Sequence, residues 1–190
     1  MEMQTERLRE DIAAAQAGVA QGFESLLATF GPRLYGFFLK ATGNHHDAED
    51  LLGEISVRLV RSIADYDDRG RFEPWLFRIA ANMVRDSRRH NRCRPGVISL
   101  SGQEEDGEPF MPPAPPQGDR LEAREDAEKL AAALKSLDED TSRMIMLRHY
   151  GQMSFKEIAA LFAMPLGTVL ARVHRGLGTL RRLMATSDES

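Results

Sequence analysis

The sequence of 190 residues has one cysteine and no excess of positive charge. Because a disulfide needs two cysteines, Cys93 cannot form one within the chain, and we expect a reducing, cytoplasmic environment. No apolar run of about 18 residues predicts a membrane span, and none resembles a signal peptide. Cys93 and His90 alone do not predict zinc, because a structural site needs a complete tetrahedral ligand set.

The total charge, formally −4, does not suggest a nucleic-acid partner, but its distribution is uneven. Residues 1–94 carry 14 basic and 14 acidic side chains, residues 95–140 carry 4 and 12, and residues 141–190 carry 7 and 3. The acidic residues are therefore concentrated in the middle of the chain. Charge arranged in this way indicates different partners for different parts of the protein.

The strongest pattern lies between residues 71 and 94, RFEPWLFRIAANMVRDSRRHNRCR. Apolar side chains recur there at helical spacing, with Pro74 in a first turn, and predict one buried stripe. A second stripe is polar and consists of Arg78, Asn82, Arg85, Arg89 and Arg92, with Arg88 beside it. A solvated surface would explain such a charge run. Arginine together with nearby aromatic residues, Phe72 and Trp75, nevertheless favours phosphate contacts and base stacking.

Helices are also predicted in the rest of the N-terminal half. Apolar periodicity predicts one helix over residues 5–30, an interruption at Gly31-Pro32, and a second helix from Leu34 to about Thr42. A third helix follows and ends near Asp65. Together with the patterns further along, this predicts an all-α protein.

A cluster of residue types that bind metals precedes the third helix and consists of His45, His46, Asp47, Glu49 and Asp50. Adjacent histidines point in different directions on a helix, and acidic residues in a first turn are stabilised by the helix dipole. We therefore predict no metal site. Glu54 follows Asp50 by four residues and shares its outward side of the helix.

Residues 95–120 contain six prolines, four glycines and several acidic residues, with no apolar period. This composition predicts a flexible linker, because the segment cannot bury a core.

Helices are predicted again over residues 121–137 and 138–150. Ser154 and Glu157 then form a capping box, and residues 164–167 form a turn of the length found in a helix-turn-helix. Short amphipathic helix pairs also occur in proteins that do not bind DNA.

These motifs together resemble a bacterial RNA polymerase sigma factor of the extracytoplasmic-function (ECF) group, over about residues 22–94 and 137–183. The matching segments are 23–35 (FESLLATFGPRLY), 47–65 (DAEDLLGEISVRLVRSIAD), 72–92, 154–161 (SFKEIAAL), 167–169 and 174–175. The resemblance implies two small helical domains: a region 2 helical bundle, residues 1–94, and a region 4 helix-turn-helix domain, residues 121–190. Residues 95–120 would be the flexible acidic Pro-rich linker between them.

The resemblance also implies a function and a set of site residues. A sigma factor binds core RNA polymerase through the β′ and β subunits, directs it to promoter DNA, and is not itself an enzyme or a cofactor-binding protein. Asp50 and Glu54 match positions that dock on the polymerase. Positions that bind the −10 element match Phe72, Trp75, Arg78, Asn82, Arg85, Arg88, Arg89 and Arg92, and positions that bind the −35 element match Thr168, Arg172, His174 and Arg175. An anti-sigma factor is a further partner that the resemblance allows.

The sequence departs from the family pattern at three places. Gly53 stands where the family usually has a glutamine beside the docking glutamate. Leu170 and Ala171 replace polar residues of the recognition helix, and Gly176 and Gly178 replace an alanine and an arginine. We therefore expect a weakened polymerase contact, and a −35 element that is bound weakly or is unusual.

Two other functions are compatible with parts of the sequence. A sigma-like decoy would bind an anti-sigma factor without recognising DNA, but it would not need arginines on the DNA-facing stripes. A stand-alone helix-turn-helix regulator would leave residues 22–94 without a role. An enzyme built on His45, His46 and Asp47 would need a bound metal.

Overall fold

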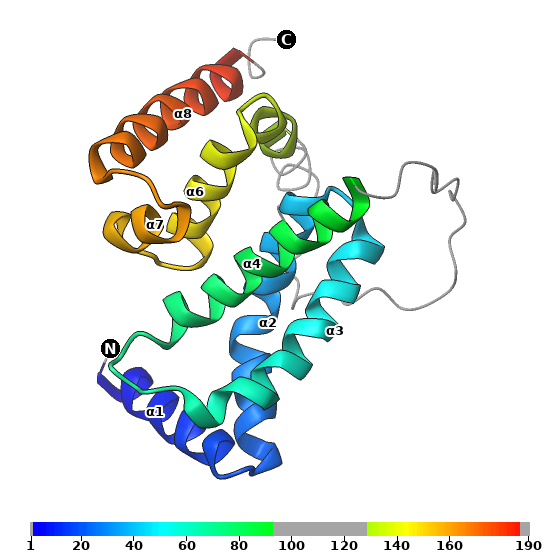
Figure 1. Cartoon of the computed structure of the whole chain (residues 1–190), viewed down its shortest axis with the longest axis vertical. Helices are drawn as coiled ribbons and strands as arrows, with labels where there is room; N and C mark the ends of the chain where they lie inside the picture. The colour runs from blue at the N-terminus through cyan, green and yellow to red at the C-terminus, as the bar shows by residue number, and fades with distance from the viewer. Residues whose placement is uncertain (1, 93–128, 187–190) are drawn as a thin grey trace, which may run out of the picture. The chain divides into compact units, whose positions relative to one another are not determined.

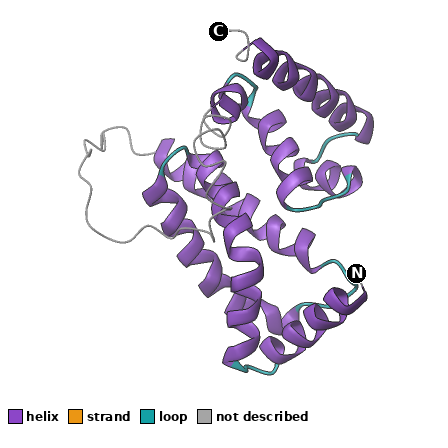
Figure 2. Cartoon of the chain, turned by 180° about the vertical axis from the view of Figure 1, so that it is seen from behind, coloured by secondary structure: helices purple, strands orange, loops and turns teal. Residues whose placement is uncertain are grey.

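The computed structural model describes residues 2–92 and 129–186, and in these two ranges the chain forms helices and loops without a strand (Figure 2). The predicted all-α fold is therefore confirmed. The predicted linker, residues 95–120, lies outside the described residues. The chain divides into two compact units: unit 1 is Met1–Arg69 with Ile79–Pro113, and unit 2 is Gly70–Arg78 with Ala114–Ser190.

Four helices and one short 3-10 helix make up the described N-terminal part (Figure 1). They are α1 (Glu2–Gln16), α2 (Ala20–Thr42), α3 (His45–Ser62), η1 (Ile63–Asp65) and α4 (Phe72–Arg92). Within unit 1, α2 packs against both α1 and α3. Side chains from these three helices, including Phe37, Phe38 and Ile55, are fully buried and form the core. The beginning of α4, up to Arg78, groups with unit 2, and its remainder with unit 1.

The break between the first two helices is not where we expected it. The predicted helix over residues 5–30 and the interruption at Gly31-Pro32 are wrong, because α1 ends at Gln16 and α2 continues through Pro32. Gly18 has a φ of +77°, and its N–H donates to Ala15 O at 3.0 Å. The N–H of Val19 donates to Ala14 O at 2.9 Å. This pattern closes a helix around a left-handed glycine.

Pro32 does not end α2 because the residues around it are held by the core. A proline inside a helix costs about 3 kcal/mol, since it removes a hydrogen bond and crowds the preceding turn. Phe30 and Leu34, on either side of Pro32, are both buried. Burying each of these side chains contributes about 1.5 to 3 kcal/mol, so the two together offset the penalty.

Three helices form the C-terminal part of unit 2: α6 (Glu139–Tyr150), α7 (Phe155–Phe162) and α8 (Leu166–Thr186). Residues 129–135, ahead of them, are also helical, so the predicted helix over 121–137 is described only from residue 129. The predicted capping box at Ser154 and Glu157 is confirmed and begins α7. The axes of α7 and α8 differ in direction by 107°. This angle and the short turn confirm the predicted helix-turn-helix.

We predict that Gly22→Ala lowers the free energy of unfolding by about 1 to 3 kcal/mol, the usual effect of overpacking. A Cβ atom on Gly22 would lie 2.5 Å from Ala15 N and 2.7 Å from Asp11 O, so α1 and α2 would have to separate. Gly53→Ala is the matched control, because a Cβ there would meet nothing within 4 Å. This control should stabilise α3 by about 0.5 to 1 kcal/mol.

Urea denaturation of both variants and the unsubstituted chain measures the two effects, with the unfolding slope compared to check that the transition remains the same. Equal changes in the two variants would contradict the packing role of Gly22.

Candidate functional site

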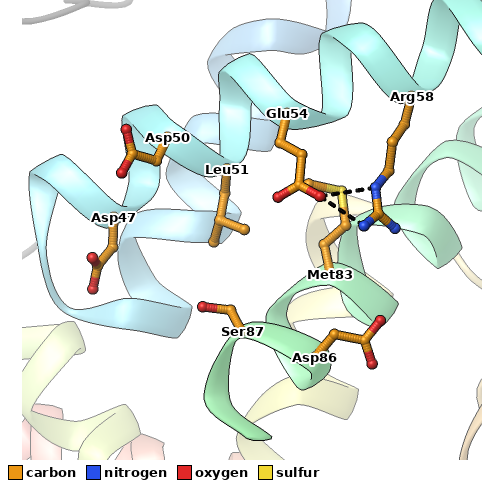
Figure 3. A pocket seen from close by; sticks show the side chains of 8 residues that line it. All are labelled: Asp47, Asp50, Leu51, Glu54, Arg58, Met83, Asp86 and Ser87. Atoms are coloured by element: carbon orange, nitrogen blue, oxygen red, sulfur yellow. Dashed lines mark hydrogen bonds and ion pairs between the residues drawn. The ribbon is translucent and has the colours of Figure 1, made fainter. Parts of the chain in front are cut away.

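An acidic groove of about 400 Å³ lies between α3 and α4 in unit 1. Figure 3 shows the eight side chains that line it: Asp47, Asp50, Leu51, Glu54 and Arg58 from α3, and Met83, Asp86 and Ser87 from α4. Asn44 starts α3 by accepting hydrogen bonds from the N–H groups of His46 (2.8 Å) and Asp47 (3.3 Å). Since this cap sets the beginning of the helix, it also sets which α3 residues face the groove.

Both residues predicted to dock on the polymerase line this groove. Asp50 is exposed and lies 3.6 Å from His46 Nε2. Glu54 is half-exposed, and its Oε1 accepts hydrogen bonds from Arg58 Nη2 (2.6 Å) and Nε (3.1 Å). The sequence prediction missed Arg58, although its spacing of four residues from Glu54 is a usual one for ion pairs on a helix. An exposed pair of this kind contributes about 1 kcal/mol or less, so Glu54 remains able to exchange its partner.

The residues predicted to bind the −10 element are all on α4 but differ in exposure. Arg78, Arg85 and Arg89 are exposed, and Asn82 is half-buried. The guanidinium of Arg88 donates a hydrogen bond to the carbonyl oxygen of Ala41, at the end of α2. Arg92 is the last residue of α4, and its side chain lies outside the described part of the structure. The structure thus brings Arg85 and Arg89 together as an accessible basic pair one turn apart.

Phe72 and Trp75 lie in the first turn of α4. Their ring centroids are 5.4 Å apart and their planes are tilted by 40°. Phe72 is 2% exposed, whereas Trp75 is half-buried. In this conformation only Trp75 therefore offers part of its ring to a base, and Phe72 packs inside the protein. Their predicted roles in −10 binding stay predictions.

The residues predicted to bind the −35 element lie on α8. Thr168, His174 and Arg175 are exposed. Arg172 differs, because its side chain is 34% exposed and its Nη1 lies 3.6 Å from Asp138 Oδ1 and 3.9 Å from Asp140 Oδ2. The sequence prediction did not include Asp138 or Asp140. No local signal could have identified them, since they precede Arg172 by 34 and 32 residues.

Asp138 also begins α6, where its Oδ1 accepts a hydrogen bond from the N–H of Thr141 at 3.0 Å. Hydrogen bonds from Thr141 lower the pKa of Asp138, and the positive charge of Arg172 lowers it further, while burial acts in the opposite direction. The carboxylate is consequently ionised at neutral pH and carries its full charge beside Arg172.

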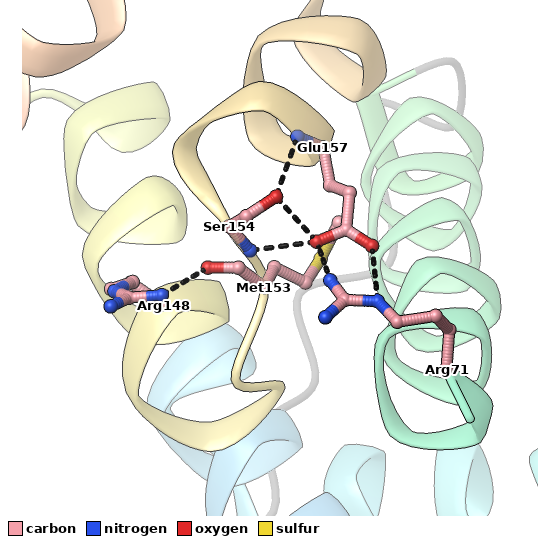
Figure 4. A network of polar contacts seen from close by, with 5 residues as sticks. All are labelled: Arg71, Arg148, Met153, Ser154 and Glu157. Atoms are coloured by element: carbon pink, nitrogen blue, oxygen red, sulfur yellow. Dashed lines mark hydrogen bonds and ion pairs between the residues drawn. The ribbon is translucent and has the colours of Figure 1, made fainter.

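Glu157 is the centre of a second polar network in unit 2 (Figure 4). Its carboxylate accepts hydrogen bonds from the N–H and the hydroxyl of Ser154, each at 2.7 Å. It also accepts hydrogen bonds from Arg71 Nε at 3.2 Å and from Arg71 Nη2. Arg148 of α6 donates from Nη1 to the carbonyl oxygen of Met153, in the turn before α7, at 2.9 Å. The capping glutamate therefore holds both the start of α7 and the residue that precedes α4.

In the cluster of potential metal ligands before α3, the two histidines contact different residues. The hydroxyl of Tyr35 and His45 Nδ1 are 2.7 Å apart, while His46 pairs with Asp50. Among the described residues, no three His, Cys, Asp or Glu side chains could hold a metal ion together. Within the same ranges, no single helix is long and apolar enough to cross a membrane.

Residues 26–93 match the family described as Sigma-70 region 2, and residues 127–180 match the family described as Sigma-70, region 4. RNA polymerase sigma factor CarQ of Myxococcus xanthus is 35% identical over 88% of this chain and 91% of its own length. ECF RNA polymerase sigma factor SigE of Mycolicibacterium smegmatis is 34% identical over 91% of this chain and 65% of its own length.

A solved structure with a similar fold is among those that match this chain. It contains the sigma factor RpoE in complex with the anti-sigma factor NepR from Bartonella quintana, and the similarity covers 87% of this chain and 98% of that one. The TM-score is 0.66 and the sequence identity is 23%.

We predict that Glu157→Gln lowers the stability of unit 2 at pH 7 by about 1 kcal/mol, the usual contribution of a helix cap. Burial raises the pKa of Glu157, but hydrogen bonds from Arg71 and Ser154 lower it by more, so the pKa lies below the ordinary 4.5. A carboxylate whose pKa falls on folding stabilises the protein above the unfolded pKa, and this stabilisation is lost as pH falls below it. The variant should therefore lose less stability than the unsubstituted chain below pH 4.5.

Urea denaturation at a series of pH values, followed by the fluorescence of the single tryptophan, Trp75, tests this. The control is Glu24→Gln, which neutralises an exposed carboxylate on α2. A parallel loss of stability with pH in Glu157→Gln and the unsubstituted chain would refute the assignment.

Proposed function

The chain belongs to the ECF group of RNA polymerase sigma factors, and on this premise we propose which of its surfaces bind the polymerase and the two promoter elements. It binds core RNA polymerase and directs transcription initiation at promoters by recognising −10 and −35 elements. Residues 1–94 form the region 2 domain and residues 121–190 form the region 4 domain. Residues 95–120 join the two domains.

Polymerase docking is proposed for the acidic groove between α3 and α4. The observation that supports it most is the position of Asp50 and Glu54 on one wall, with Asp86 contributed by the second helix. A groove that carries carboxylates from two helices suits a basic helical element of the β′ subunit. Gly53, between the two docking residues, has open space around it, so its effect is on helix propensity rather than on packing.

Binding of the −10 element is proposed for the arginine side of α4. Arg85 and Arg89 are accessible, and arginine forks fit the phosphates of a single strand. Trp75 is half-buried and offers part of its ring for stacking.

Binding of the −35 element is proposed for α8, through Thr168, Arg172, His174 and Arg175 in a major groove.

Further partners and the place of action are also part of this proposal. We infer no reaction catalysed by the chain itself and no cofactor, and we place it in the cytoplasm with the polymerase. An anti-sigma factor is proposed as a regulator, because a solved structure with a similar fold contains one.

The first test concerns docking. Asp50→Asn with Glu54→Gln should weaken binding to core polymerase by about tenfold, with less dependence on salt, since charge complementarity at such a surface sets both. Glu10→Gln with Glu24→Gln is the control, because it removes the same charge from exposed positions on α1 and α2. Equilibrium binding of labelled protein to core polymerase at several salt concentrations measures the effect. Equal affinity of the docking variant and the control would refute the groove as the docking surface.

The second test concerns DNA melting. Arg85→Ala with Arg89→Ala should abolish promoter opening while core binding is retained, because two contacts to the strand backbone are lost. Each lost contact on single-stranded DNA also lowers the salt dependence of binding by about 0.7. The control is Arg7→Ala with Arg9→Ala, two exposed arginines on α1.

Opening is followed by the reactivity of unpaired thymines in the holoenzyme complex. Unchanged opening in the α4 variant would refute the strand contacts. If the unsubstituted chain binds an anti-sigma factor but neither polymerase nor promoter, the decoy function replaces the proposed one.

A further inference from the structure

We propose that Asp138 and Asp140 position Arg172 and thereby determine how strictly the protein discriminates the −35 element from other DNA. This inference rests on the proposed role of α8 in −35 recognition. It assigns the two carboxylates of α6 to a specificity role, and it gives Gly176 a role in bringing them to Arg172.

The first observation is that Arg172 lies within ion-pair distance of two carboxylates, whereas the other proposed −35 residues are exposed. Its Nη1 lies 3.6 Å from Asp138 Oδ1 and 3.9 Å from Asp140 Oδ2. Thr168, His174 and Arg175 are exposed. Ion pairs to two carboxylates at one end of a guanidinium favour orientations in which its other N–H groups point away from them. The flexible arginine therefore has a restricted set of orientations before DNA arrives.

The second observation explains why these elements meet. Gly176 follows Arg172 by one turn on the same side of α8, and it is buried. A Cβ atom on Gly176 would lie 2.6 Å from Thr141 Cγ2 and 2.9 Å from Ile145 Cδ1. The absence of a side chain thus lets α8 approach α6 closely, next to the N-terminus of α6 where the carboxylates lie. The departure from the family pattern at Gly176 therefore has a packing role.

The third observation is that the carboxylates are themselves fixed. Asp138 accepts the N–H of the buried residue Thr141, at 3.0 Å. Asp140 Oδ1 accepts a hydrogen bond of 2.6 Å from Arg143 Nη2. The side chain of Arg143 is only 12% exposed and lies over the ring of Phe162 in α7, 5.2 Å from its centroid. Asp140 is therefore connected to all three helices of the helix-turn-helix unit.

Arg143 explains why the charges of this cluster balance. Its Nε is buried and has no hydrogen-bond partner among the described residues, while its Nη2 pairs with Asp140. Asp140 in turn is shared with Arg172. Two carboxylates and two guanidinium groups thus form one cluster, and removing a single carboxylate leaves an excess of positive charge beside α8.

The consequence for DNA recognition follows from the two kinds of protein–DNA contact. Contacts to phosphate are independent of sequence, while contacts to base edges discriminate. A free arginine binds any nearby phosphate, but two fixed carboxylates repel the backbone and keep the guanidinium directed. The pair therefore lowers binding to random DNA and favours a base-edge contact of Arg172. Because an oriented arginine loses less conformational entropy on binding, the specific complex is favoured as well.

The main experiment uses Asp138→Asn, because asparagine also caps a helix and the hydrogen bond to Thr141 is retained. Holoenzyme with the unsubstituted chain first selects a promoter from a library randomised in the −35 region. Binding is then measured to this duplex and to the same duplex with a scrambled −35 element. Discrimination is the ratio of the two affinities, and it is determined over a series of salt concentrations.

Asp138→Asn should lower the discrimination about tenfold, within the range that one directed arginine contributes. Binding to the scrambled duplex should increase and its salt dependence should rise by about 0.9, since Arg172 becomes free to contact a phosphate. Arg172→Ala should lower discrimination too, and adding Asp138→Asn to it should have no further effect. A purely structural role would instead weaken binding to both duplexes equally.

Gly176→Ala and Gly178→Ala provide a matched pair on α8. A Cβ on Gly178 would meet nothing within 4 Å, so this variant should discriminate as the unsubstituted chain does. Gly176→Ala should lose discrimination, because α8 moves away from Asp138 and Asp140. Unchanged discrimination in both Asp138→Asn and Gly176→Ala would overturn the inference and leave the proposed function intact. Selection of no −35 element by the unsubstituted holoenzyme would overturn the proposed −35 role itself.

Discussion

The contact between Gly176 of α8 and Thr141 of α6 sets the position of the predicted recognition helix within unit 2. The two helices can approach this closely only because Gly176 has no Cβ atom, since protein interiors are close-packed and have low compressibility. That approach brings the basic side of α8 to the acidic beginning of α6. Gly22 acts in the same way between α1 and α2 in unit 1. Each unit thus depends on a glycine where two helices cross.

The charged side chains of the proposed binding surfaces form ion pairs within the protein. Glu54 is paired with Arg58 in the acidic groove, and Arg172 is paired with Asp138 and Asp140 on α6. Exposed ion pairs contribute about 1 kcal/mol or less to stability. Such pairs orient a side chain in the free protein, and the pair at Glu54 is weak enough for a polymerase contact to replace it. The buried Arg143 is different, because losing Asp140 would leave its charge without compensation.

Helix caps connect the fold to the proposed surfaces. Asn44 begins α3, whose next turns carry the docking residues, and Asp138 begins α6 while contacting Arg172. Glu157 completes the capping box of α7 and also pairs with Arg71. A cap is placed by local sequence, yet its side chain has hydrogen-bonding capacity left over. In this chain, that remaining capacity makes contacts between elements that are distant in the sequence.

Most of the secondary structure and the family of this protein could be predicted from its sequence alone. Helical periodicity, the capping box at Ser154 and the helix-turn-helix depend on residues a few positions apart, and the order of its motifs identified the family. Tertiary structure decided the rest. The core carried α2 through Pro32, because burial of Phe30 and Leu34 offsets a local penalty. Likewise, the partners of Arg172 and the second wall of the acidic groove come from distant segments, and only packing brings them together.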